Sequence, residues 1–281
     1  MALRAPWCCS EATRTHTRAM IAYAGRGVAR PRYYANDHSR DVLDIVAVEM
    51  DITDARGEAL TLDGAGFALV AHRSALAEFT DHAAVEATYR PEIIELVGAL
   101  TGADLVVVNS PGILRYSERS PHSGVLDNSR PARFAHVDVS DATAAAFAHR
   151  AAPAPPGRPL ARFAHFNIWR ALSAPPQDVP LAVCDARTVR ATDLIAADAV
   201  FDRPGEPEWS FEGLLLAHAR RHRWHWYSDM HRGEALIFKT YDSDPGRAHC
   251  VPHVAFDNGA SPAHAPPRVS IEMRALALWF D

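Results

Sequence analysis

Hydrophobic and polar residues alternate with a period of two in several short segments, and this pattern predicts β-strands. The predicted strands are 42–50, 59–70 (a strand pair), 104–108, 134–139, 162–170, 179–189, 235–241 and 268–279. The run 104–108 is apolar after Asp104, which favours a central position in a sheet. Two stretches, 74–86 and 91–100, predict helices instead. Pro91 suits a first helical position and Gly102 suits a helix end.

A shorter helix is expected further along the chain, because Ser140 and Asp141 can cap an alanine-rich segment that runs to Arg150. The proline-rich loop at 151–159 is too short for a domain linker. Many short strands after a helical preface predict a β-rich α+β fold. The expected architecture is a double-stranded β-helix, a cupin-like jelly roll, with bracing helices.

Length and composition set the class of protein. The 281 residues are 48% hydrophobic and 22% charged, as in globular proteins, and the formal charge is −5. We expect a flexible tail at 1–20 and a single domain at 21–281. No basic stripe is evident, which argues against a nucleic-acid partner. No apolar run reaches the ~18 residues of a membrane span. The four cysteines form no C-x-x-C pair, so a reduced, cytoplasmic protein is expected.

A histidine and an aspartate two residues apart, His136 and Asp138, lie in the strand predicted at 134–139. Residues i and i+2 of a strand point to the same face, so the imidazole and the carboxylate can converge on one point. A second histidine from a later strand completes a two-histidine, one-carboxylate set with open coordination positions. That set is typical of non-heme Fe(II) oxygenases. A solvated strand end is the alternative interpretation.

Two histidines compete for the remaining ligand position, His249 and His253. We favour His253 because it opens the strand-like segment 253–256 and lies nearer to the C-terminal strand. His249 follows the turn at 244–247. A core or surface histidine without a metal is the alternative for His253.

The C-terminal strand has one wholly polar face, formed by Arg268, Ser270, Glu272 and Arg274. An arginine and a serine two residues apart can clamp a carboxylate, because the guanidinium is a planar fork. We assign this clamp to Arg268 and Ser270, and expect Arg274 to pair with Glu272 or another carboxylate. Asn167 is expected to donate to the co-substrate or to support the metal site. The alternatives are a solvated edge strand and a satisfied core amide.

Five residues are expected to face the substrate, three within predicted strands and two after the strand at 104–108. They are Arg115, Tyr116, Trp169, Arg170 and Arg274.

A series of ordered blocks resembles the CmcJ/NvfI/AsaB-like hydroxylase/desaturase family, whose members look like Fe(II)/2-oxoglutarate oxygenases. The blocks are Pro31–Tyr34, Tyr89–Glu92, Ala135–Ser140, Phe166–Arg170, Leu181–Arg187, Glu234–Ser243, His253–Phe256 and Pro267–Arg274. The resemblance implies Fe(II) on His136, Asp138 and His253, and 2-oxoglutarate on Arg268 and Ser270. It also implies O2 as oxidant, a small natural-product-type substrate, and no catalytic residue beyond the metal centre.

Rival functions find less support in the residues. A methyltransferase is disfavoured because no glycine-rich loop follows a first strand. A cupin-like binding protein without turnover is disfavoured because the presumptive ligands and the Arg-x-Ser pair are all present. A zinc hydrolase has no use for that pair.

Overall fold

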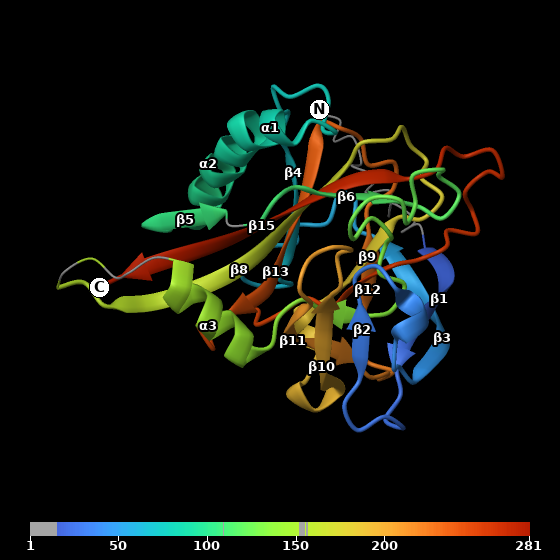
Figure 1. Cartoon of the computed structure of the whole chain (residues 1–281), viewed down its shortest axis with the longest axis horizontal. Coiled ribbons are helices and arrows are strands. Elements are labelled where there is room, and N and C mark those ends of the chain that lie inside the picture. The colour runs from blue at the N-terminus through green and yellow to red at the C-terminus, as the bar shows by residue number, and fades with distance from the viewer. Residues whose placement is uncertain (1–15, 109, 152–154, 156) are drawn as a thin grey trace, which may run out of the picture.

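The computed structural model describes residues 16–108, 110–151, 155 and 157–281, and within them the strands form two sheets that pack against each other (Figure 1). The larger sheet has the order β1-β3-β12-β9-β14-β7-β11-β10-β2. Its strands are β1 (His16–Ala24), β2 (Arg32–Tyr34), β3 (Ile45–Asp54), β7 (His136–Val137), β9 (Leu181–Cys184), β10 (Leu194–Phe201), β11 (Trp209–Leu216), β12 (Trp224–Trp226) and β14 (His253–Ala255).

The smaller sheet has the order β4-β13-β8-β15-β5, and β6 pairs with the first half of β15. Its strands are β4 (Phe67–Ala71), β5 (Leu105–Val108), β6 (Ile113–Tyr116), β8 (Leu160–Ala171), β13 (Glu234–Asp242) and β15 (Val269–Phe280). This arrangement confirms the predicted double-stranded β-helix with bracing helices.

The helices pack on both faces of the smaller sheet. Helix α1 (His82–Ala84) leads through a π-helical turn at Val85–Tyr89 into α2 (Arg90–Thr101), and α3 is Asp141–Ala151. Figure 1 shows α2 beside β5 and α3 near the end of β8. None of the helices in the described part of the chain is long and apolar enough to cross a membrane.

Side chains alternate between the two faces of the smaller sheet, so the hydrophobic core has one layer on each face. On β15, Ile271 and Met273 face outward and pack with Ile93 and Val97 of α2. The intervening polar residues therefore face the larger sheet. Between the sheets lies a second cluster, with members of both. It includes Phe67, Trp169, Leu181, Val183, Leu236, Phe238 and Val251.

Several details of the fold differ from the sequence-based expectation. The strand pair expected at 59–70 is the single strand β4, because residues 62–65 form a turn. Residues 74–80 are not helical, because the Ser74 hydroxyl accepts a hydrogen bond from the Leu76 amide and the helix begins only where Asp81 caps it. Strand β5 lies at a sheet edge rather than in the centre, and α2 covers it. Part of the expected tail, His16–Met20, belongs to β1. Residues 1–15 lie outside the described part. As predicted, Gly102 ends α2, with a φ of 63°.

Candidate active site

Strand pairing brings two histidines from distant parts of the chain together. In the larger sheet β7 lies between β14 and β11, and the register places His253 directly opposite His136. Opposite residues on neighbouring strands share a face, and the two ring centroids are 4.2 Å apart. Asp138 follows two residues after His136, with Oδ1 3.6 Å from His136 Nε2. One ligand atom from each of the three buried side chains lies within 4.8 Å of the others.

Backbone carbonyl groups fix the orientation of both imidazoles. His136 Nδ1 lies 3.0 Å from the Phe134 oxygen, and His253 Nδ1 lies 3.3 Å from the Val251 oxygen. A carbonyl can only accept, so Nδ1 carries the proton in each ring. Each Nε2 is then left with its lone pair free for a metal, the usual arrangement for metal-binding histidines.

The smaller sheet holds the carboxylate of Asp138 in place. Asn167 on β8 and Arg274 on β15 lie opposite each other in the register. Asn167 Nδ2 donates to Asp138 Oδ2 at 2.6 Å, and Arg274 Nη2 lies 3.3 Å from Oδ1. Arg274 Nε also donates to Glu272 at 3.0 Å, so this arginine bridges two buried carboxylates. Asn167 is therefore a positioning residue for Asp138 in this structure.

Electrostatics keep the set deprotonated. Burial by itself raises the pKa of Asp138, but the positive charge of Arg274 is the largest opposing influence, and the pKa lies well below its usual range. Burial, assisted by His136, lowers the pKa of His253 to about 3. A carboxylate and a neutral imidazole are the forms that bind a metal, so neither has to lose a proton at neutral pH.

A small cavity of about 30 Å³ adjoins the three residues. Arg268 lines it and is 1% exposed. Its Nη1 donates to the Val179 oxygen at 2.9 Å, whereas its Nε has no hydrogen-bond partner among the described residues. The Ser270 hydroxyl, fully buried on the same face of β15, has none there either. Burial, with Arg115 nearby, lowers the pKa of Arg268 to about 10. Unsatisfied buried donors are costly, so this place fits an anionic ligand that accepts from Arg268, which lines the cavity, and reaches Ser270, which does not line it.

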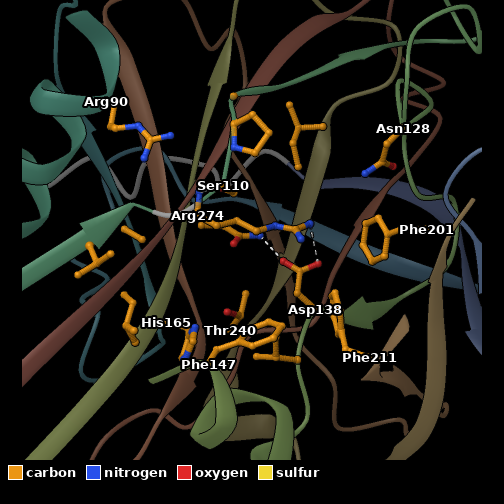
Figure 2. A pocket seen from close by; sticks show the side chains of 18 of the residues that line it. Arg90, Ser110, Asn128, Asp138, Phe147, His165, Phe201, Phe211, Thr240 and Arg274 are labelled. Carbon is orange, nitrogen blue, oxygen red and sulfur yellow. Dashed lines mark hydrogen bonds and ion pairs between the residues drawn. The ribbon is translucent and has the colours of Figure 1, made fainter. Parts of the chain in front are cut away.

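A larger cavity of about 1160 Å³ lies on the other side of Asp138. Figure 2 shows Arg274 and Asp138 near its centre, with Ser110 beside Arg274, Arg90 to the upper left and Asn128 to the upper right. Asn167, Thr240 and His165 also line it. The carboxylate of Asp138 borders both cavities, so a metal held there is accessible from either.

Side-chain alternation along the strands separates the expected substrate-facing residues into those that line a cavity and those that do not. Arg274 lines the large cavity, and Arg115 and Trp169 line the small one. Tyr116 and Arg170 line neither, and these two expectations are wrong. Each follows an inward-facing residue on its strand, so its side chain points to the opposite face.

The outward side chains of these two residues have other partners. Tyr116 belongs to the core cluster beneath α2. Arg170 donates to the His72 carbonyl oxygen at 2.7 Å and to the Tyr89 hydroxyl at 3.2 Å. Both residues therefore serve packing on the outer face of the smaller sheet.

The competing histidine lies elsewhere. His249 Nε2 is 3.0 Å from Asp141 Oδ1, and its ring packs against Tyr241 at a centroid distance of 5.0 Å. Its side chain is 45% exposed. Among the described residues, the group that can hold a metal contains His253 and not His249.

An aromatic wall of the large cavity escaped the sequence analysis. Phe147 on α3 and Phe201, Trp209 and Phe211 on the β10–β11 hairpin line this cavity. The i, i+2 spacing of Trp209 and Phe211 was the available signal, because it places both rings on one face of a strand. Nothing local indicated that this face borders the metal-ligand set.

The chemistry of the donor set fits one class of protein. Two imidazoles and one carboxylate leave coordination positions open, and the adjoining Arg268 and Ser270 donors fit the carboxylate of a chelating co-substrate. Together with a double-stranded β-helix, these features define a non-heme Fe(II)/2-oxo-acid oxygenase.

Comparisons with known proteins agree. A family model described as "Oxidoreductase/YMDC permease-like domain" matches residues 24–278. Hydroxylase/desaturase CTB9 of Cercospora beticola is 32% identical over 237 residues, covering 78% of this chain and 72% of the relative. The Fe(II)/2-oxoglutarate-dependent dioxygenase nvfI of Aspergillus novofumigatus is 35% identical over 202 residues, covering 70% and 68%.

Solved structures extend the likeness to the whole fold. A structure of the iron and alpha-ketoglutarate-dependent endoperoxidase NvfI superposes with a TM-score of 0.78 at 26% identity, covering 96% of this chain and all of the other. The chain belongs to the family of Fe(II)/2-oxoglutarate-dependent hydroxylases/desaturases and dioxygenases. Fe(II), 2-oxoglutarate and O2 are the cofactor and co-substrates of this family.

Proposed function

We propose that this oxygenase hydroxylates or desaturates a small molecule, with Fe(II) held by His136, Asp138 and His253 and 2-oxoglutarate held by Arg268 and Ser270. The observation that carries the proposal is the juxtaposition of the two sets. Three ligand atoms lie within 4.8 Å of one another, and the cavity beside them is lined by a buried guanidinium whose Nε lacks a partner among the described residues.

Bound Fe(II) and 2-oxoglutarate supply the oxidation, in which O2 converts the co-substrate to succinate and CO2 and oxidises a C–H bond of the substrate. The chain's own residues position these groups. Asn167 holds Oδ2 of Asp138 at 2.6 Å, so Oδ1, which also faces Arg274, would be the oxygen that binds the metal. Arg274 compensates the buried charge of Glu272, so the site tolerates two carboxylates close together.

The small cavity sets a condition on co-substrate binding. Its 30 Å³ corresponds to roughly one water molecule. The five-carbon co-substrate is larger, so side chains around Arg268 must move when it binds. The large cavity, at about 1160 Å³, already exceeds the range of roughly 300–1,000 Å³ that is usual for small-molecule sites. We therefore assign the substrate to the large cavity.

The test is anaerobic titration of the purified protein with Fe(II), followed by measurement of succinate released from 2-oxoglutarate after O2 is admitted. We expect one Fe(II) per chain, and we expect His136→Ala and Asp138→Ala to lose nearly all of the iron and all succinate release. His249→Ala is the matched control, because this histidine lies outside the group, and it should bind iron normally. Full iron occupancy and turnover in the first two variants would refute the assignment.

A further inference from the structure

The aromatic wall of the large cavity (Phe147, Phe201, Trp209 and Phe211) has an open face. Trp209 and Phe201 stack at a centroid distance of 4.4 Å and an interplanar angle of 14°. Phe211 lies 5.3 Å from Phe201, and Phe147 meets Phe211 edge-on at 5.4 Å. Trp209 nevertheless remains 54% exposed. A large aromatic side chain at the mouth of a cavity offers a flat surface on which another ring can stack.

The wall belongs to the same cavity as the metal-ligand set. Figure 2 shows Phe201 and Phe211 to the right of the central Asp138, and Phe147 near His165. The wall comes from two elements, α3 and the β10–β11 hairpin, so its shape does not depend on one mobile segment. A ring resting on it therefore lies within the space that Asp138 borders.

A positive charge stands beside the wall. The Arg150 guanidinium carbon lies 5.0 Å from the Phe147 ring centroid, and its Nε donates to the Ala146 oxygen. Among the described residues, no carboxylate forms an ion pair with it. The other cavity arginines are paired: Arg90 with Glu86, Arg203 with Glu206, and Arg274 with Asp138 and Glu272. Arg150 is thus the cation of this cavity available to an external anion.

We propose that the substrate is a flat ring compound that carries an acidic oxygen, with the ring on the aromatic wall and the acid on Arg150. This deepens the proposed function and rests on it for the reaction, but the two can fail separately. A wall of stacked aromatic rings selects planarity, and the guanidinium selects an anion. A flexible aliphatic substrate gains nothing from either feature.

The test uses two fluorescent probes of nearly identical shape, the anion 1-anilinonaphthalene-8-sulfonate and the neutral N-phenyl-1-naphthylamine. Both are titrated into the full chain loaded anaerobically with Fe(II) and 2-oxoglutarate, and iron content is measured in the same samples. We expect the anion to bind more tightly, and its advantage to shrink as salt rises, because screening weakens an exposed charge pair.

Variants separate the two features. Trp209→Leu should weaken both probes by about fivefold, whereas Trp209→Phe keeps an aromatic face and should change them by less than about twofold. Arg150→Gln should weaken the anion alone, by about threefold or more, and remove its salt dependence, and Arg150→Lys should retain it. Val46→Ala, on exposed β3, controls for dye bound elsewhere.

Equal binding of both probes by all of these variants would overturn the proposal. So would equal effects of Trp209→Leu and Trp209→Phe, because the wall would then recognise apolar surface rather than rings. If Arg150→Gln weakens both probes equally, Arg150 does not recognise an anion, and the proposal that the substrate carries an acidic oxygen is refuted. A failure of iron loading with these probe results intact would instead contradict the metal assignment and leave the substrate class standing.

Discussion

The role of Arg268 is the part of the site that a single substitution tests most directly. Its guanidinium is 1% exposed, forms no ion pair with a carboxylate among the described residues, and borders the cavity next to the metal-ligand set. We choose Arg268→Met, which keeps an unbranched apolar stem of similar length and removes the charge and the donors.

The expected loss follows from the burial. Removing one partner of a desolvated, charge-assisted contact costs on the order of 2–5 kcal/mol of binding. At about 1.4 kcal/mol for each tenfold change, this corresponds to a dissociation constant for 2-oxoglutarate raised by about 30-fold to about 4,000-fold. We expect the stability of Arg268→Met to change much less than its affinity for 2-oxoglutarate, because replacing a buried uncompensated charge with an apolar group is often neutral or stabilising.

Arg274→Met provides the contrast. Arg274 lies 3.3 Å from Asp138 Oδ1 and 3.0 Å from Glu272 Oε1, so its loss leaves two buried carboxylates without their cation. Breaking such buried pairs typically costs about 3–5 kcal/mol of stability. We expect this variant to melt at a lower temperature and to bind 2-oxoglutarate with little change.

The assay is calorimetric titration of 2-oxoglutarate into anaerobic, Fe(II)-loaded protein, with a thermal melt of each metal-free variant. Arg268→Lys should fall between the wild type and Arg268→Met, because it keeps the charge and loses the planar fork. If Arg274→Met loses the co-substrate and Arg268→Met keeps it, the assignment of the clamp to Arg268 is refuted.

Three further predictions concern groups around the metal ligands. Asn167→Ala removes the 2.6 Å hydrogen bond to Asp138 and should weaken Fe(II) binding by about 10- to 100-fold in anaerobic titrations, and unchanged affinity would contradict this role. Gly213→Ala places a Cβ 2.9 Å from the Asp138 carbonyl oxygen, so it should displace the Asp138 segment and reduce iron occupancy. Normal iron occupancy and an unchanged melting temperature would show that the backbone accommodates the methyl group without moving Asp138. Burial lowers the pKa of His165 from 6.5 to about 4, so the unfolded chain binds the proton first and the free energy of unfolding falls as the pH drops from about 6.5 to about 4. The contribution is at most about 3 kcal/mol, and urea titrations at both pH values should show a smaller loss in His165→Gln.

Local rules predicted the parts of the site that depend on adjacent residues. The i, i+2 relation of His136 and Asp138 and the polar face of β15 follow from strand geometry alone, and the structure places both as expected. The same rule, applied strictly, excludes Tyr116 and Arg170, because each stands next to an inward-facing residue. Naming neighbours on one strand as substrate-facing overlooked that alternation.

Long-range pairing was the part that local rules could not supply. His253 and His136 meet because β14 and β7 pair in one register, and 116 intervening residues carry no local signal of that pairing. The wall on β10 and β11 is hidden for the same reason. Those rings read as ordinary apolar strand residues until the opposite sheet closes the cavity over them.

The polar face of β15 explains how one strand can serve both cavities. Arg268 lines the small cavity and Arg274 lines the large one, and six residues of extended chain separate their Cα atoms by ~20 Å. The two cations therefore cannot exchange roles through side-chain motion alone. Glu272 stands between them and pairs with Arg274, which ties that arginine to the Asp138 side. Because β15 pairs with β8 along nearly its whole length, this spacing is set by the ladder of a buried strand rather than by a loop. In the proposed site, a co-substrate in the small cavity and a substrate in the large cavity thus approach the metal ligands from opposite sides, and a register change in β15 displaces Arg268 and Arg274 together.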